Sequence, residues 1–113
     1  MKRLVEIRAY QLQPGAAVAF HDAVVTRAVP MLREWGTDVV AFGPSQHEAD
    51  TYYLIRAYAD LADRQARQDA FYGSSAWRDG PRESIVGQLQ SYLNTVLWLP
   101  PAAVDALREG GVP

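Results

Sequence analysis

The stretch EIRAYQLQPG, residues 6–15, decides the fold, because polar and apolar side chains alternate along it. Glu6, Arg8 and Tyr10 alternate with Ile7 and Ala9, and Pro14-Gly15 ends the run. This period of two predicts a strand over residues 4–12. A strand with Glu, Arg and Tyr on one face raises the question of whether that face meets solvent or lines a site.

Helical and extended patterns follow each other along the rest of the chain. They predict a helix from about Ala16 to Trp35 with a kink at Pro30, strands at 37–43 and 51–58, helical segments at 59–77 and 81–90 interrupted by the Gly-Ser-Ser of 73–75, and a last strand at 91–99. This β-α-β-β-α-β order predicts an α+β, ferredoxin-like domain with a four-stranded antiparallel sheet and helices on one face. We expect this domain over residues 1–100, and a short helix or loosely attached tail over 101–113.

Composition excludes several kinds of protein. The chain has 113 residues, a net charge of -2 and no cysteine, so it has no disulfide and no thiolate metal site. Without a basic patch, an apolar span or the apolar core of a signal peptide, we expect a cytoplasmic protein that binds neither nucleic acid nor membrane. His21 and His47 lie far apart in the sequence, so we expect no metal site.

The two central strands of the predicted sheet differ in the side chains that they offer to each face. One face has only Val5, Ile7, Ala9, Tyr53, Ile55 and Ala57, and we expect the helices to pack on it. The other face collects Glu6, Arg8, Tyr10, Leu54, Arg56 and Tyr58. Tyrosines interleaved with arginines are typical of a partly buried wall, so we expect a second copy of the chain to cover this face.

These residues are also the candidate site. Arg8 and Arg56 would hold an anionic group, Tyr10, Tyr58 or His21 would move protons, and Glu6 would orient an arginine or take a proton. Leu54, Trp77 and Trp98 would complete the substrate-binding wall. The alternative is an ion-pair and tyrosine network that only fixes the dimer, with His21 as a packing residue. An open pocket of roughly 300 Å³ with unpaired arginines would favour a ligand site.

Five segments, in order, resemble the NIPSNAP family. VEIRAYQLQPG is similar to its opening Glu-x-Arg-x-Tyr strand with Pro-Gly, and the others are AVPMLREWG, VVAFGP, YLIRAYADLADRQARQDA and AWRDG. The resemblance covers about residues 4–99 and implies a dimeric α+β barrel, in which two such sheets face each other. That superfamily includes cofactor-free monooxygenases, isomerases, dehydratases and haem-handling proteins.

From the residues and this resemblance we expect a homodimeric, small-molecule-binding enzyme without a cofactor. Its chemistry would be acid/base chemistry (isomerisation, cyclisation or dehydration) or cofactor-free oxygenation in biosynthetic metabolism. Its substrate would be small, anionic and aromatic or polyketide-like. The alternative is a ligand-binding or assembly protein without catalysis. A haem would need His21 as its axial ligand, since no other histidine lies on a predicted helix or strand.

Overall fold

The computed structural model describes residues 1–110 and has one four-stranded antiparallel sheet in the order β2-β3-β1-β4. The strands are β1 (Arg3–Leu12), β2 (Asp38–Pro44), β3 (Thr51–Tyr58) and β4 (Leu89–Leu99). The helices are α1 (Ala17–Ala23), the π-helix η1 (Val24–Ala28), α2 (Val29–Glu34), α3 (Leu61–Gly73), α4 (Ser75–Arg78), α5 (Arg82–Val86) and α6 (Pro101–Glu109). The predicted α+β, ferredoxin-like topology is confirmed.

The elements follow the predicted order, with three local differences. The predicted kink at Pro30 takes the form of a π-helical turn just before it, and Pro30, which has no backbone N–H to donate, lies in the first turn of α2. The helix predicted over 81–90 ends at Val86, and β4 begins at Leu89, because Leu89 already pairs with Leu12 of β1. The predicted tail contains a regular helix, α6.

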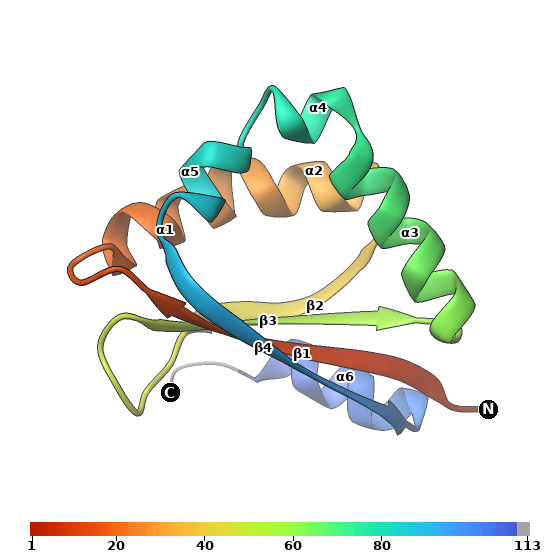
Figure 1. Cartoon of the computed structure of the whole chain (residues 1–113). Helices are drawn as coiled ribbons and strands as arrows, with labels where there is room; N and C mark the ends of the chain where they lie inside the picture. The colour runs from red at the N-terminus through yellow and green to blue at the C-terminus, as the bar shows by residue number, and fades with distance from the viewer. Residues whose placement is uncertain (111–113) are drawn as a thin grey trace.

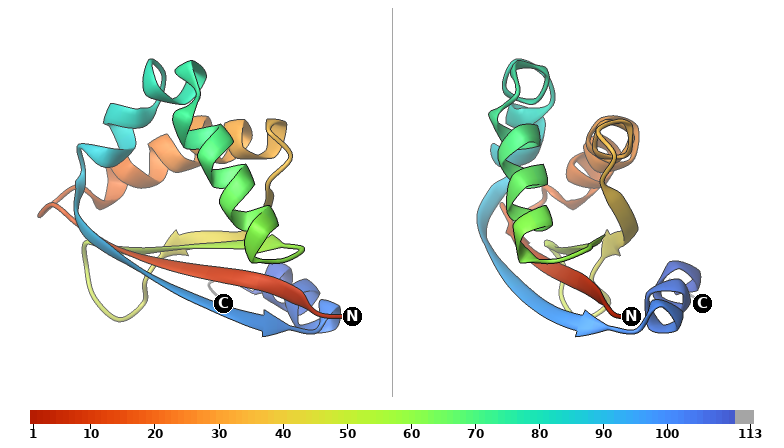
Figure 2. Two further views of the ribbon diagram at one scale, coloured as in Figure 1. Left: turned by 45° about the vertical axis from the view of Figure 1, so that its right-hand side comes forward. Right: turned by 90° about the vertical axis from the view of Figure 1, so that its right-hand side faces the viewer.

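Helices cover both faces of the sheet. In Figure 1, α1 to α5 lie above the sheet and α6 lies beneath it. The right-hand view in Figure 2 shows two helical arms above the curved sheet, α3 to α5 on one side and α1 to α2 on the other. No helix among residues 1–110 is long and apolar enough to cross a membrane.

The prediction of which sheet face meets the helices is wrong. Tyr10, Leu12, Tyr52 and Leu54 pack in one core with residues of α1 to α5, such as Phe20. Glu6, Arg8 and Arg56 lie on the same face and bond to side chains of α3. The polar strand face therefore points at the chain's own helices, and no second copy is needed to cover it.

The apolar strand face has a different cover, the C-terminal helix. Val5, Val40, Ile55 and Ala57 form a second core with Val104 of α6. The sequence interpretation assigned the most apolar strand face to the predicted helices, but it treated residues 101–113 as peripheral. With α6 available to bury the apolar face, the helices α1 to α5 are free to pack on the polar one.

Candidate functional site

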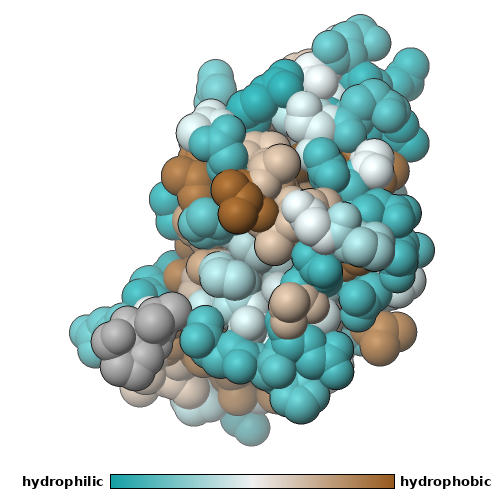
Figure 3. Space-filling model, turned by 90° about the vertical axis from the view of Figure 1, so that its left-hand side faces the viewer, coloured by the Kyte–Doolittle hydropathy of each residue, from teal (hydrophilic) through white to brown (hydrophobic). Residues whose placement is uncertain are grey.

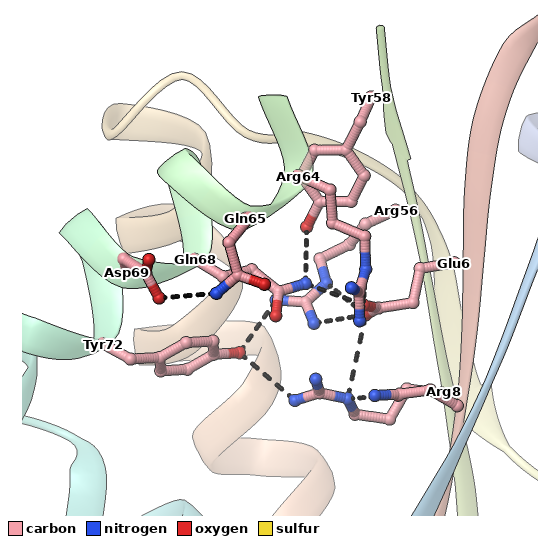
Figure 4. Close-up of polar contacts among 10 residues, drawn as sticks. Glu6, Arg8, Arg56, Tyr58, Arg64, Gln65, Gln68, Asp69 and Tyr72 are labelled. Carbon is pink, nitrogen blue, oxygen red and sulfur yellow. Dashed lines mark hydrogen bonds and ion pairs between the residues drawn. The ribbon is translucent and has the colours of Figure 1, made fainter. Parts of the chain in front are cut away.

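Glu6 is the centre of a buried cluster of charges between the sheet and α3, shown in Figure 4. Its cross-strand partner on β3 is Arg56, whose Nε and Nη2 both donate to Glu6 Oε1, the Nε at 3.2 Å. From α3, Arg64 Nε and Gln68 Nε2 each donate to Glu6 Oε2 at 2.7 Å. Both carboxylate oxygens are thus satisfied within the chain.

Electrostatics keep Glu6 ionised. Burial by itself raises the pKa of the Glu6 carboxyl, but the charges of Arg56 and Arg8 and hydrogen bonds from Arg56 and Gln68 outweigh it and lower the pKa to about 2. A carboxylate with so low a pKa is a poor proton acceptor at neutral pH. Glu6 is therefore suited to holding arginines in place, which was one of its two predicted roles.

Tyr72 of α3 links this cluster to a cavity. Its hydroxyl oxygen accepts a hydrogen bond from Arg56 Nη1 at 2.8 Å, and Arg8 Nη1 lies 3.5 Å from the same oxygen. Both guanidiniums are donors only, so the Tyr72 O–H proton must point away from them. The side that remains is the cavity, which Tyr72 lines. Tyr72 can therefore donate a hydrogen bond to a ligand there.

Arg8 is oriented by residues of β4 and β1. Its Nε donates to Asn94 Oδ1 of β4 at 2.8 Å and lies 3.7 Å from Glu6 Oε1. Its guanidinium carbon is 4.6 Å from the centre of the Tyr92 ring, which is a cation–π distance. Unlike Arg56, Arg8 also lines the cavity. It is the arginine of the Glu6 cluster that a bound molecule can reach.

The cavity lies between the sheet and η1, α2, α3, α4 and α5 and has a volume of about 300 Å³. Most of its wall is apolar or aromatic, and the lining residues used below are Arg8, Tyr10, Leu54, Gln68, Phe71, Tyr72, Trp77, Arg82, Val86 and Tyr92. Within residues 1–110, no aspartate or glutamate lines it. Two arginines without a carboxylate partner in the wall make it an environment for an anion.

Tyr10 is another phenol that lines the cavity. Burial raises its pKa to about 12, an effect that nearby Tyr72 adds to and the charges of Arg8 and Arg56 oppose. Tyr10 therefore stays protonated at neutral pH and can act as a hydrogen-bond donor. It could give a proton to a developing anion, but it is not a base.

The predicted site residues divide into three groups. Arg8, Tyr10, Leu54 and Trp77 line the cavity. Glu6, Arg56 and Tyr58 are buried behind its wall, where Gln68 Nε2 donates to the Tyr58 hydroxyl at 3.2 Å. His21 and Trp98 do not line the cavity.

The two residues outside the cavity have other surroundings. The His21 ring is exposed and borders a separate groove along β2, with its Nδ1 2.6 Å from the Tyr52 hydroxyl. Trp98 is half-exposed near the end of β4, across from Leu4. Among residues 1–110 there is no group of three or more histidines and carboxylates that could hold a metal ion.

Sequence reasoning missed the contribution of α3. Arg64, Gln68 and Tyr72 follow each other at four-residue spacing and so form one stripe on the helix that faces the sheet. The apolar Leu61, at the start of the same helix, is instead 61% exposed. The inner face of α3 can be recognised in the sequence by its polar residues at helical spacing, which match the buried charges of the strands opposite.

Solved structures with this fold include several bacterial proteins. A NIPSNAP family protein of unknown function from Agrobacterium tumefaciens has a TM-score of 0.79 and 20% identity, over 87% of this chain and 88% of that one. An uncharacterized NIPSNAP-like domain protein from Burkholderia xenovorans has a TM-score of 0.77 and 23% identity, over 87% and 84%.

A third solved structure comes from a protein with a different description. It is a candidate antibiotic biosynthesis monooxygenase from Bordetella bronchiseptica, with a TM-score of 0.64 and 18% identity over 88% of this chain and 96% of that one. At these identities the likeness shows a shared fold. No curated protein matches the sequence. The pattern that defines the NIPSNAP family matches residues 5–101, and the chain belongs to that family.

Proposed function

We propose that the cavity binds a small, anionic, aromatic or polyketide-like molecule and promotes proton transfer on it without a cofactor. The observation that carries this proposal is the pairing of Arg8 with Tyr72 at the wall of a cavity without a lining carboxylate among residues 1–110. Both groups can donate to one anionic oxygen, and Glu6 holds both arginine partners of Tyr72 in position. Preorganised donors of this kind stabilise an oxyanion without reorganisation.

Charge balance supports an anionic ligand. Arg8, Arg56 and Arg64 all surround Glu6, so three guanidiniums face one carboxylate. Two positive charges are left without a carboxylate in this cluster. Buried charge is costly when it is not paired, so the cluster favours an anion that enters the adjacent cavity.

The protonation states limit the chemistry. Tyr10 and Tyr72 can donate, Glu6 is a weak base, and none of the described lining residues is a carboxylate or histidine. Such a site suits a substrate whose own C–H is acidic and whose enolate needs stabilising and then reprotonating at another atom. Isomerisation and cyclisation of a dicarbonyl compound have this requirement.

Cofactor-free oxygenation is a second candidate, favoured by the fold shared with the Bordetella protein. A stabilised enolate or phenolate is electron-rich enough to react with O₂. Conversion of its CH₂ group to C=O uses one oxygen atom, and the other leaves as water, so the substrate supplies all the electrons. The same donors, Arg8 and Tyr72, would serve this reaction.

The non-catalytic alternative has partial support from the same geometry. Arg56 is saturated by Glu6 and Tyr72, as a purely structural network requires. That network lies within one subunit, so it stabilises the chain's own fold rather than a dimer contact. A purely structural role does not explain why Arg8 lines an open cavity.

The proposal is tested with 1-phenylbutane-1,3-dione, which is aromatic and forms an enolate. We expect the protein to bind the enolate, followed by its ultraviolet absorbance, and to accelerate exchange of the central C–H for deuterium, followed by NMR in D₂O. Arg8→Ala removes a charge-assisted donor and should weaken enolate binding about tenfold to hundredfold. Tyr72→Phe should slow exchange more than it weakens binding, because its O–H is used most in the transition state.

The control is Arg78→Ala, because Arg78 is an exposed arginine of α4 that does not line the cavity. It should match the wild-type protein in binding and exchange. Enolate binding without faster exchange would support the non-catalytic alternative. Equal binding by wild type and Arg8→Ala would overturn the proposed site.

A further inference from the structure

Arg82 of α5 is a second cation in the cavity wall, on a different element from Arg8. The side chain of Arg8 is only 9% exposed, whereas that of Arg82 is 43% exposed. Arg8 therefore lies deep in the cavity and Arg82 lies where the wall meets solvent. Resting on the proposed function, we propose that the ligand is a dianion whose acidic groups lie at its two ends, one on Arg8 and one on Arg82.

The partner of Arg82 leaves it available to a ligand. Arg82 Nη1 donates to Glu83 Oε1 at 2.7 Å, and the Glu83 side chain is 80% exposed. Exposed pairs of this kind contribute little, because solvent and salt screen them. This is the one hydrogen bond that the Arg82 side chain makes within residues 1–110. A ligand carboxylate that is less exposed to solvent would compete well with Glu83.

The backbone around Arg82 is fixed, although its side chain is partly exposed. Pro81 and Ile85 are buried on either side of it. Arg27 Nη1 of η1 also donates to Ser84 Oγ at 2.9 Å, which ties α5 to the opposite helical arm. The Cα atom of Arg82 is thus held in a defined position, and from there the long side chain can turn its guanidinium toward the cavity.

The rest of the cavity wall is mainly apolar and aromatic. Phe71, Trp77 and Val86 lie in it, and Tyr92 stacks on Arg8. A flat hydrocarbon body with one acidic group at each end matches this arrangement of charge and apolar surface. The charges also match, because two cavity arginines face no carboxylate among the described lining residues.

Naphthalene carboxylates of one skeleton test this inference, with Kd measured by isothermal titration calorimetry. We expect naphthalene-2,6-dicarboxylate to bind about tenfold more tightly than naphthalene-2-carboxylate. Naphthalene-2,3-dicarboxylate has the same charge on adjacent carbons and should gain much less. Arg82→Ala should abolish the advantage of the 2,6-compound and weaken the monocarboxylate much less, whereas Arg8→Ala should weaken both.

Arg78→Ala is again the control and should leave every Kd unchanged, and circular dichroism should show that all variants are folded. Three results would overturn the inference while the proposed function stands. They are equal Kd values for the 2,6-compound and the monocarboxylate, equal Kd values for the two dicarboxylates, and an equal loss of 2,6-compound and monocarboxylate binding in Arg82→Ala. Unchanged binding in Arg8→Ala would instead overturn the proposed function, and the inference with it.

Discussion

At the scale of single residues, Glu6 holds the arginines of the site although it does not line the cavity itself. It is completely buried and bonds to Arg56 and Arg64, and it lies beside Arg8. Each arginine would otherwise carry an uncompensated charge into the interior. Glu6 therefore stabilises this part of the core and, together with Asn94, helps to set the direction in which Arg8 points.

We predict that Glu6→Gln lowers the free energy of unfolding by about 3–5 kcal/mol, because it leaves Arg56 buried without a counter-charge. Urea unfolding followed by circular dichroism measures this loss. Glu83→Gln is the matched control, because it removes a carboxylate from an exposed pair and should change stability by less than about 0.5 kcal/mol. Similar losses in the two variants would show that burial of the Glu6 pair is unimportant.

Acid should destabilise the protein through the same residue. The pKa of Glu6 falls from an ordinary 4.5 to about 2 on folding, so the unfolded chain takes up the proton first as the pH falls. The stabilisation is complete above about pH 4.5 and is lost by about pH 2, and it amounts to about 3 kcal/mol.

Unfolding measured between pH 6 and pH 2 tests this acid dependence. The slope in the acid range should be clearly smaller in Glu6→Gln than in the wild-type protein. Asp38, whose pKa is lowered by its hydrogen bond with Arg108, keeps a smaller acid dependence in both proteins. Identical slopes would contradict the prediction.

At the scale of elements, α6 makes the fold different from a sheet with helices on one face only. Val104 is 1% exposed and packs with Val5, Val40 and Ile55 beneath the sheet. Arg108 Nη1 and Nη2 also donate to both carboxylate oxygens of Asp38, at 2.7 and 2.8 Å, which attaches α6 to β2. The helix is an integral part of the domain rather than an appendage.

We predict that Val104→Ala lowers the free energy of unfolding by about 2 kcal/mol, because it removes two buried methyl groups and leaves a cavity under the sheet. Chemical denaturation measures the change. Val18→Ala makes the same chemical change at a residue of α1 that is 85% exposed, and it should have almost no effect. If both variants are equally stable, α6 does not contribute to the cooperative unit.

At the scale of the whole molecule, apolar side chains remain exposed on both sides of the sheet. On the side drawn in Figure 3, hydrophobic residues gather in a patch in the helical half, surrounded by hydrophilic ones. On the face that α6 shares, Leu93 of the edge strand β4 is 78% exposed and Ile7 is only partly buried. A second copy of the chain would cover this remaining apolar surface.

We therefore predict a homodimer that forms through the sheet face of Leu93, not through the polar face expected from the sequence. Sedimentation equilibrium should give twice the subunit mass of 12.5 kDa for the wild-type protein. Leu93→Lys should shift the mass to that of one subunit, because a charge in the contact is costly to bury. Val18→Lys, on the helical side, should stay dimeric. A wild-type mass of one subunit would contradict this prediction.

Much of the fold and part of the site follow from the sequence alone. Alternation in β1 and β3, the Asp60 N-cap that accepts from the Asp63 amide at 2.7 Å, and the breaks at Pro30 and Gly73-Ser74-Ser75 are local features. Local features depend on neighbours in the chain, which the sequence states directly. The same alternation places Arg8, Tyr10 and Leu54 on one strand face, and in the structure these three residues line the cavity.

Only the tertiary structure decided which way each face points and which arginine is accessible. Period-two alternation separates two strand faces but does not say what covers each, because that depends on helices far away in the sequence. The covers are α3, whose Gln68 reaches Glu6, and α6, whose Val104 fills the apolar side. No local sequence pattern indicates how α3 and α6 pack on the sheet. Their packing buries Arg56 in the core and leaves Arg8 in the wall of the cavity.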